Sequence, residues 1–297
     1  MDDRLPSLTA LAVALARAVY TDAPYALRAA SDPIAKRLLP PGISHLAAAT
    51  SFAWHTPRIT QRALHAIGLG FLDHVALRTA AIDAALESAI CEGIQQLVIL
   101  GAGLDARAWR LDSLASVRVL EVDHPATQGY KRRRVEGLVS RAKELRFVSV
   151  DFERDSLGDC LASAGHDPTV RSFWLWEGVT PYLHPAAINA TLAIVRTRSV
   201  AGSIVALSYG TPELLAIGPG TETLLRHAAQ LIREPVHGLM STLEMQSLLD
   251  RHGFTVDSDT DTRDWAVRFW PAREARTVQS RERLLVARVP PPYTSIR

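Results

Sequence analysis

The amino-acid sequence predicts an α/β fold built on a mostly parallel sheet. The first observation is the apolar run at residues 97–100, which is typical of a strand buried on both faces. The second is that strand-like runs then alternate with helical stretches, which favours a parallel sheet covered by helices on both faces. The third is a closing pair of strand-like runs, which predicts an antiparallel edge. Together they predict seven strands, at residues 97–100, 117–122, 145–150, 173–176, 202–209, 254–256 and 283–289.

Helices are expected between these strands. The first four connections contain helical stretches at 105–111, 126–142, 154–164 and 185–199. A further helix is expected to begin at Ser241 or Thr242, with Glu244 completing a capping box, and to end near Gly253. The segment 257–275, between the last two strands, is expected to be irregular.

The chain is expected to form one structural domain with an added cap. Residues 1–70 are predicted to be an N-terminal helical cap region, in which Ser7 is the N-cap of the first helix and 32–39 contains a short helix. Residues 71–297 are predicted to be the α/β domain. Within it, residues 211–240 are punctuated by proline and glycine and are expected to form a helical lid insert.

The clearest helix is predicted at residues 71–90. Its apolar stripe at helical spacing consists of Phe71, Val75, Ile82, Leu86 and Ile90. Arg78 lies within that stripe, and an arginine on an apolar face needs a partner. That partner is either an acid of the protein, in a structural ion pair, or the carboxylate of a ligand.

Composition excludes several classes of function. The chain has 297 residues, 47% of them apolar and 22% charged, with a net charge of +2, so it gives no general signal for nucleic acid. The basic run at 131–134 lacks interleaved aromatic residues and is expected to be a solvated helix face. No uncharged apolar stretch reaches membrane-spanning length, and no secretory signal is evident. We therefore expect a cytoplasmic protein, monomeric or homodimeric, with free thiols at Cys91 and Cys160.

Polar groups or glycine stand at the ends of four consecutive predicted strands. They are Gly101, Asp123, Asp151 and Glu177. Ligands of open parallel sheets bind at the carboxyl ends of the strands, and glycine lets the backbone approach them closely. An acid after the second strand can accept hydrogen bonds from ribose hydroxyls. A tight turn of an ordinary α/β protein remains the alternative, and the absence of a lysine after the glycines disfavours a P-loop.

Several sequence pieces, in order and at their spacing, resemble one family. They are SDPIAKRLL at 31–39, RTAAID at 78–83, LVILGAGLDARAWRL at 97–111, LEVDHPATQGYKRRR at 120–134, DF at 151–152 and WEGVTPYL at 176–183. In these pieces the chain resembles the leucine carboxyl methyltransferase family, which includes bacterial S-adenosylmethionine-dependent methyltransferases and polyketide carboxyl methyltransferases. The resemblance covers most of residues 8–210 and thins beyond them.

The resemblance implies a class I methyltransferase fold, with a Rossmann-like sheet, and S-adenosylmethionine as cofactor. Arg78 would hold the methionine carboxylate, Asp123 the ribose hydroxyls with Glu121 beside it, and Asp151 the adenine amine. The complete implied cofactor-binding set is Arg78, Gly101, Gly103, Glu121, Asp123, Asp151, Phe152 and Glu177. The chain departs from the family at Phe152, often leucine, and at Pro181, often methionine.

The implied reaction is transfer of a methyl group to an oxygen of a small-molecule acceptor, without a metal. We expect a carboxylate acceptor of a secondary metabolite, which needs no general base. A hydroxyl acceptor needs one, and Tyr182, His184 and His124 are the candidates near the strand ends. Carboxyl methylation of a protein C-terminus is a further alternative.

Two other classes of protein share part of this pattern. Gly101, Gly103 and Ala106 fit the dinucleotide pattern of a nicotinamide oxidoreductase, with Glu121 twenty residues after the first glycine. No tyrosine is followed four residues later by lysine, which disfavours a short-chain dehydrogenase. A non-catalytic ligand-binding protein would have lost ligand contacts, whereas here the motif residues are present.

Overall fold

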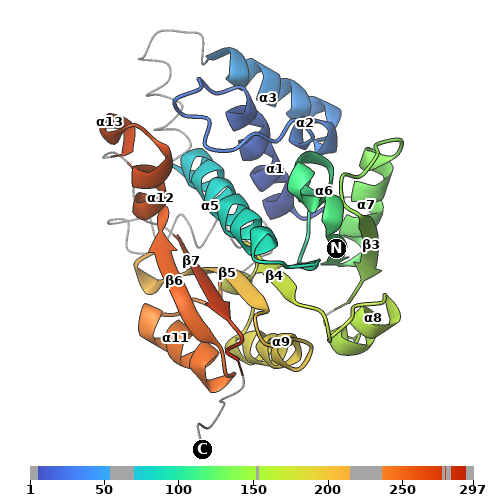
Figure 1. Ribbon diagram of the computed structural model, residues 1–297. Helices are drawn as coiled ribbons and strands as arrows, with labels where there is room; N and C mark the ends of the chain where they lie inside the picture. The colour runs from blue at the N-terminus through green and yellow to red at the C-terminus, as the bar shows by residue number, and fades with distance from the viewer. Residues whose placement is uncertain are drawn as a thin grey trace, which may run out of the picture.

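The computed structural model describes residues 6–53, 70–151, 154–214, 236–275, 278 and 282–291. Within them the sheet has seven strands in the order β3-β2-β1-β4-β5-β7-β6 (Figure 1). The strands β1 to β5 are parallel, and β7 is antiparallel to both β5 and β6. The predicted seven-stranded sheet with an antiparallel edge is therefore confirmed. The strands are β1 Gln96–Leu100, β2 Arg118–Asp123, β3 Glu144–Ser149, β4 Ser172–Trp176, β5 Ile204–Gly210, β6 Thr255–Asp261 and β7 Glu282–Arg288.

Helices cover both faces of this sheet (Figure 1). The α-helices are α1 Leu8–Thr21, α2 Ala35–Leu38, α3 Pro41–Ala53, α5 Phe71–Cys91, α6 Arg107–Arg110, α7 Pro125–Val135, α8 Leu157–Ser163, α9 Pro185–Thr197, α11 Thr242–Arg251, α12 Thr262–Phe269 and α13 Ala272–Ala275. The 3-10 helices are η1 Asp112–Ser116, η2 Thr180–Tyr182 and η3 Pro212–Leu214.

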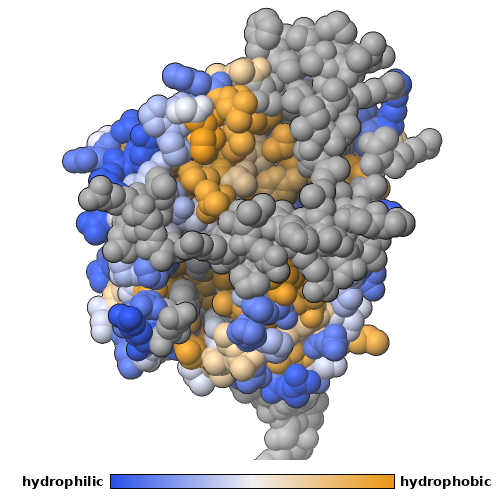
Figure 2. Space-filling view, turned by 180° about the vertical axis from the view of Figure 1, so that it is seen from behind, coloured by the Kyte–Doolittle hydropathy of each residue, from blue (hydrophilic) through white to orange (hydrophobic). Residues whose placement is uncertain are grey.

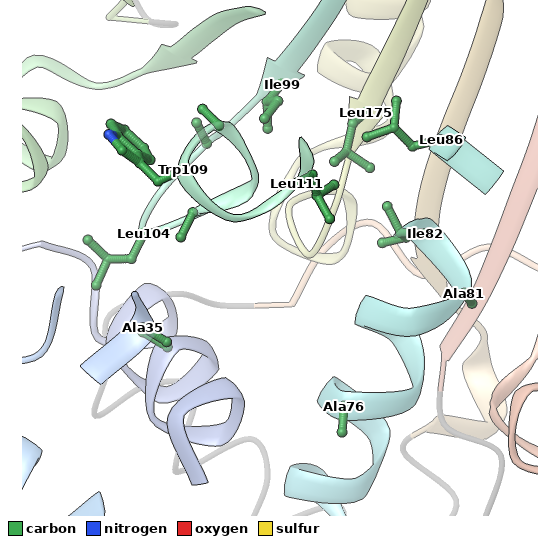
Figure 3. Close-up of a cluster of buried hydrophobic side chains, with 14 of the residues drawn as sticks. Ala35, Ala76, Ala81, Ile82, Leu86, Ile99, Leu104, Trp109, Leu111 and Leu175 are labelled. Atoms are coloured by element: carbon green, nitrogen blue, oxygen red, sulfur yellow. The ribbon is translucent and has the colours of Figure 1, made fainter. Parts of the chain in front are cut away.

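The sheet divides the buried apolar residues into two clusters, because successive side chains of a strand point to opposite faces. In β1, Leu97 and Ile99 belong to one cluster, whereas Val98 and Leu100 belong to the other. Figure 3 shows the first cluster, in which Ile82 and Leu86 of α5 approach Leu175 of β4. Figure 2 shows the molecule from behind, with apolar residues gathered around a hollow in its upper half. Hydrophilic residues lie toward the outer edge of the molecule in this view.

The N-terminal helices are joined to α5 chiefly through α1. Helix α1 contacts α5, α2 and α3, and Ser7 caps it, as predicted, by accepting a hydrogen bond from Ala10 N–H. Tyr20 of α1 stacks on Trp270, with ring centroids 6.1 Å apart. These contacts place the first helix of the chain beside the carboxyl ends of the strands.

The segment 257–275 is not irregular, and that prediction is wrong. Strand β6 continues to Asp261, and the segment then forms α12 and α13. The sequence of β6 is almost entirely polar because this edge strand is stabilised by cross-strand ion pairs with β7, Arg288–Asp257 at 2.6 Å and Arg283–Asp259 at 2.8 Å. A strand of this composition lacks the alternation of apolar and polar residues from which a strand is predicted.

Some predicted boundaries also change. The helical stretch predicted at 105–111 contains only α6, with the 3-10 helix η1 following it, and the stretch predicted at 126–142 ends at Val135. The capping box of Ser241 and Glu244 is present as predicted. Of the predicted lid insert at 211–240, residues 215–235 lie outside the described residues. After them, Met240 N–H donates to Gly210 O at 3.1 Å, so both described ends of the insert meet beside β5.

No helix in the described part of the chain combines the length and apolarity needed to cross a membrane.

Candidate functional site

A pocket of about 290 Å³ lies at the carboxyl ends of the parallel strands. One wall comes from α1, and the rest comes from the strand ends, the loops that follow them, and residues of α5, α7 and η2. The lining residues are Ser7, Thr9, Ala10, Val13, Arg17, Arg78, Ile99, Gly101, Ala102, Gly103, Leu104, Asp105, Asp123, His124, Thr127, Glu177, Gly178, Val179 and Tyr182. Five of the eight predicted cofactor-binding residues are among them.

One end of the pocket, here called the glycine end, consists of Gly101, Gly103 and Asp123. Both glycines have positive φ, +66° and +49°, which other residues rarely adopt. Gly103 N–H donates to Asp123 Oδ2 at 2.5 Å, and His124 N–H donates to Oδ1 at 2.7 Å. Burial raises the pKa of Asp123, although these donors oppose the shift. The loop and the acid are thus fixed against each other by the backbone.

A second part of the lining, here called the charged end, consists of Arg17, Arg78 and Glu177. Glu177 follows β4, and its Oε1 accepts from Arg17 Nη2 at 2.7 Å and from Arg78 Nε at 3.0 Å. Its Oε2 accepts from Arg107 Nη1 at 2.9 Å. One buried carboxylate therefore holds three guanidinium groups from α1, α5 and α6.

The charge of Glu177 is stabilised by these partners. Burial acts to raise the pKa of Glu177, but the three arginines outweigh it and hold the pKa well below its usual range. The carboxylate is ionised at any physiological pH. Because its two oxygens accept from three arginines, Glu177 orients these guanidinium groups.

Arg78 has a second partner, Glu282, which the sequence analysis missed. Arg78 Nη1 donates to Glu282 Oε2 at 2.5 Å, and His74 Nε2 lies 2.7 Å from the same oxygen. Burial acts to lower the pKa of Arg78, but Glu282 and Glu177 outweigh it and raise the pKa. Strand β7 runs antiparallel to β5, so its first residue, Glu282, lies at the carboxyl edge of the parallel strands. There Glu282 pairs with Gly210, the last residue of β5.

Behind the charged end, the fully buried Arg107 lies in a network of ion pairs. Arg107 is 0% exposed; its Nε donates to Asp83 at 2.7 Å and its Nη1 to Asp105. Arg110 bonds the same Asp83 at 2.7 Å. Arg107 and Arg110 of the GLDARAWRL piece thus both meet Asp83 of the RTAAID piece, so part of these two signatures serves to build this network.

The structure places Glu121 away from the pocket lining. Its side chain is 1% exposed and accepts from Lys131 Nζ at 2.5 Å. Burial is the main cause that raises the pKa of Glu121, to about 7, with Lys131 opposing it. Lys131 is itself 1% exposed, so the prediction that the basic run 131–134 forms a solvated face is wrong at its first residue.

Of the predicted pair Asp151 and Phe152, the structure describes only Asp151. Asp151 follows β3, and Arg154 Nε lies 3.6 Å from its Oδ2. It does not belong to the described lining of the pocket. Phe152 lies outside the described residues, so its predicted contact with the adenine ring stays a prediction.

The three candidate bases occupy different places. Tyr182, in η2, lines the pocket, and so does His124, whose Nδ1 accepts from Ala126 N–H at 3.2 Å as the N-cap of α7. His184 is exposed and stacks on His237 with ring centroids 4.1 Å apart. His184 does not belong to the described lining.

Comparison with known proteins identifies the family. The sequence model of the leucine carboxyl methyltransferase family matches residues 10–196. The chain belongs to this family. The matched residues include every member of the charged end and of the glycine end. Glu282, the second partner of Arg78, lies beyond the match.

Relatives of the chain carry related names. A protein of Frankia alni, named as a proposed S-adenosyl-L-methionine-dependent methyltransferase, is 39% identical over 139 residues, which are 46% of this chain and 48% of that protein. A protein of Mycobacterium bovis with the same kind of name is 37% identical over 207 residues, 68% of this chain and 64% of that protein. The chain thus spans about half the length of the first of these relatives.

A solved structure shares the fold. It is a DUF574 family protein of Streptomyces avermitilis, with a TM-score of 0.60 and 16% identity, covering 92% of this chain and 100% of that one. With the family match, this confirms the predicted class I methyltransferase fold. Identity at this level bears on the fold alone.

Proposed function

We propose that this chain is an S-adenosylmethionine-dependent O-methyltransferase that converts a carboxylate of a small molecule to a methyl ester. The observation that carries the proposal is the pocket, which combines a glycine end and a charged end at the carboxyl edge of the sheet. Family membership supports the same activity. S-adenosylmethionine supplies an activated methyl group on a sulfonium.

The described residues fit this cofactor. Arg78 lines the charged end and is held by two acids, so its guanidinium is oriented for a carboxylate. Asp123 lines the glycine end with its oxygens fixed by two N–H donors, and carboxylate oxygens have further lone pairs for ribose hydroxyls. Gly101 and Gly103 line the same pocket, where the absence of a side chain lets a ligand approach the backbone.

The reaction is an in-line displacement in which a bond forms from the acceptor oxygen to the methyl carbon while the carbon–sulfur bond breaks. The electron pair of that bond returns to sulfur, and the neutral thioether leaves. A carboxylate acceptor is already anionic, so no proton has to move. The chain contributes by aligning the acceptor, about 3 Å from the methyl carbon, and by excluding water.

The lining supports a small acceptor with apolar character. Ala10, Val13, Leu104 and Val179 present apolar side chains to the pocket beside the charged and hydroxyl groups. A hydroxyl acceptor is the second candidate function, and it is supported by the position of Tyr182 in the lining. His184 gives it less support because its ring faces His237.

Two measurements test the proposal. The chain is expected to bind S-adenosylhomocysteine with micromolar affinity in calorimetry; no heat and no thermal shift at millimolar ligand would contradict the cofactor assignment. Incubation of labelled S-adenosylmethionine with candidate acids is expected to yield a product that mild base cleaves to methanol. A base-stable product would be a methyl ether and would overturn the carboxylate assignment in favour of a hydroxyl acceptor.

A further inference from the structure

Residues 236–240, here called the return segment, lie against the 3-10 helix η2, which carries Tyr182 in the pocket lining. The N–H groups of His237 and Gly238 both donate to Pro181 O, at 2.8 and 2.9 Å. These distances are typical of well-formed N–H···O hydrogen bonds. The return segment is therefore fixed to a wall of the pocket, although none of its own residues belongs to the described lining.

Gly238 is buried and lets the two backbones come into close contact. A Cβ on Gly238 would overlap Thr180 O and lie 2.6 Å from Leu183 O. Both are backbone atoms, which cannot turn aside as a flexible side chain can. The requirement comes from space alone, because the φ of Gly238 is not positive. Only glycine fits this contact while η2 keeps its place.

Strand β5 supports η2 twice. Ser208 Oγ accepts from Gly178 N–H at 2.8 Å, and Thr180 Oγ1 donates to Ser208 O at 2.7 Å, so β5 holds the loop that enters η2. Met240 N–H donates to Gly210 O at 3.1 Å, so β5 also anchors the return segment. Because the return segment is tied to both β5 and η2, it has little freedom to move away from a side chain at Gly238.

A displacement of η2 changes the pocket at two lining residues. Tyr182 belongs to η2, and Val179 is its N-cap. A Cβ on Gly101 would lie 2.5 Å from Val179 Cγ2, so Val179 packs against the glycine loop itself. Movement of η2 therefore alters the packing at the glycine end, where the proposed cofactor binds.

We propose that Gly238 is a positioning residue for cofactor binding, because it admits the return segment to η2 and so keeps Val179 and Tyr182 in the pocket wall. The inference rests on the proposed function and deepens it. Gly238 acts through η2 and not by contact with a ligand. It lies outside the residues that match the family model, 10–196, so the site depends on a part of the chain that the family match does not cover.

Gly238→Ala tests the proposal with two measurements. In calorimetry, the affinity for S-adenosylhomocysteine is expected to fall about three- to thirtyfold, the range for residues that modulate a site without touching its ligand. In hydrogen exchange followed by NMR, the amides of Tyr182 and Leu183, which donate to Val179 O and Thr180 O, are expected to exchange faster. Amides of β4 are the internal reference, so a lower global stability does not account for the change.

Two further variants complete the design. His237→Ala removes the ring that stacks on His184, with centroids 4.1 Å apart, and leaves Gly238 in place. It loosens the same contact without crowding it, so it is expected to change both measurements in the same direction but less. It also carries the test if Gly238→Ala does not fold. Gly42→Ala is the matched control, because a Cβ there meets nothing within 4 Å, and it is expected to change neither measurement.

The outcomes separate this inference from the proposed function. If the unmodified chain binds S-adenosylhomocysteine and the folded Gly238 variant binds it equally well, Gly238 is a structural residue alone. A loss of affinity without faster exchange in η2, or an equal loss in Gly42→Ala, would also overturn the proposal, since the effect would not act through η2. If the unmodified chain does not bind S-adenosylhomocysteine, the proposed function itself is wrong, and this inference with it.

Discussion

The two ends of the pocket are built in different ways. At the glycine end, Asp123 accepts hydrogen bonds from two backbone N–H groups. One belongs to Gly103, in the loop after β1, and the other to His124, which follows β2, the strand that ends at Asp123. At the charged end, Arg78 is held by Glu177 and Glu282, which are 99 and 204 residues away in sequence. The glycine end is therefore local and formed by backbone, whereas the charged end is long-range and formed by side chains. Substitutions are expected to disturb folding most at the charged end.

Removal of Arg107 tests this difference with the largest expected effect. Arg107→Ala leaves Asp105, Asp83 and an oxygen of Glu177 without their buried partner, so the free energy of unfolding is expected to fall by about 3–5 kcal/mol. Denaturant titration measures it. The control is Arg141→Ala, which breaks the exposed pair with Asp112 and should cost about 0–1 kcal/mol. Equal losses in the two variants would contradict the buried network's role in folding.

Removal of Arg78 is expected to affect ligand binding. Arg78→Ala should weaken S-adenosylhomocysteine binding by about 1.5–3 kcal/mol, because a charge-assisted hydrogen bond to the ligand is lost. Calorimetry measures this, with Arg283→Ala as the control, since Arg283 pairs with Asp259 beside Glu282. Retained affinity in the Arg78 variant would make this residue a structural ion-pair partner alone.

The glycine end is expected to respond to backbone strain. In Gly101→Ala the new Cβ would lie 2.5 Å from Val179 Cγ2, at a φ of +66°. We expect a loss of about 1–2 kcal/mol in unfolding free energy from the left-handed backbone, together with weaker cofactor binding. Adding Val179→Ala relieves only the contact, so recovery should be partial. Gly42→Ala, which meets nothing within 4 Å, is the control, and a loss there as large as at Gly101 would refute the argument.

The pH dependence of stability tests Glu121, the buried acid that lies away from the pocket lining. The pKa of Glu121 is about 7 in the fold against a usual value of 4.5, so the folded chain binds more protons between these values. The contribution of Glu121 to the free energy of unfolding is therefore fully present below 4.5 and is lost as the pH rises to 7. The slope is at most about 1.4 kcal/mol per pH unit, and Glu121→Gln should remove it.

His166 complicates that measurement, because it acts in the opposite direction. Burial and the charge of Arg198 lower the pKa of His166 to about 4, so its contribution rises with pH up to its usual value of 6.5. The quantity to examine is therefore the variant's profile minus that of the unmodified chain, obtained from denaturant titrations at pH 5, 6 and 7. A difference that is constant across this range would show that Glu121 does not titrate there.

The contrast between the two ends also explains what the sequence predicts. Gly101, Gly103 and Asp123 are recognised from one strand–loop–strand stretch, because their contacts follow from local connectivity. The position of Arg78 in an apolar stripe predicts that it has a partner, and both open alternatives now have support, since it bonds two acids and also lines the pocket. The contact of Glu282 with Arg78 could not be predicted, because it arises from the antiparallel direction of β7 in the folded sheet.

Burial of charge was likewise beyond the sequence pattern. Lys131 is one of four consecutive basic residues, and nothing in that run distinguishes the one that turns inward to Glu121. Arg17 interrupts an apolar helix, yet its partners are 62 and 160 residues away. The sheet and its order of helices follow from periodicity, whereas pairs of buried ions depend on tertiary contacts that periodicity does not contain.

The single carboxylate of Glu177 couples the evolution of the three arginine positions that it bonds. A chain that replaced Glu177 alone would leave three buried guanidinium groups facing one another without a common anion, and each arginine replaced alone would leave Glu177 under-neutralised. Intermediate genotypes would therefore be penalised, even where the end point is viable. Along lineages of this family, Arg17, Arg78, Arg107 and Glu177 are expected to be inherited, and to be lost, as one character.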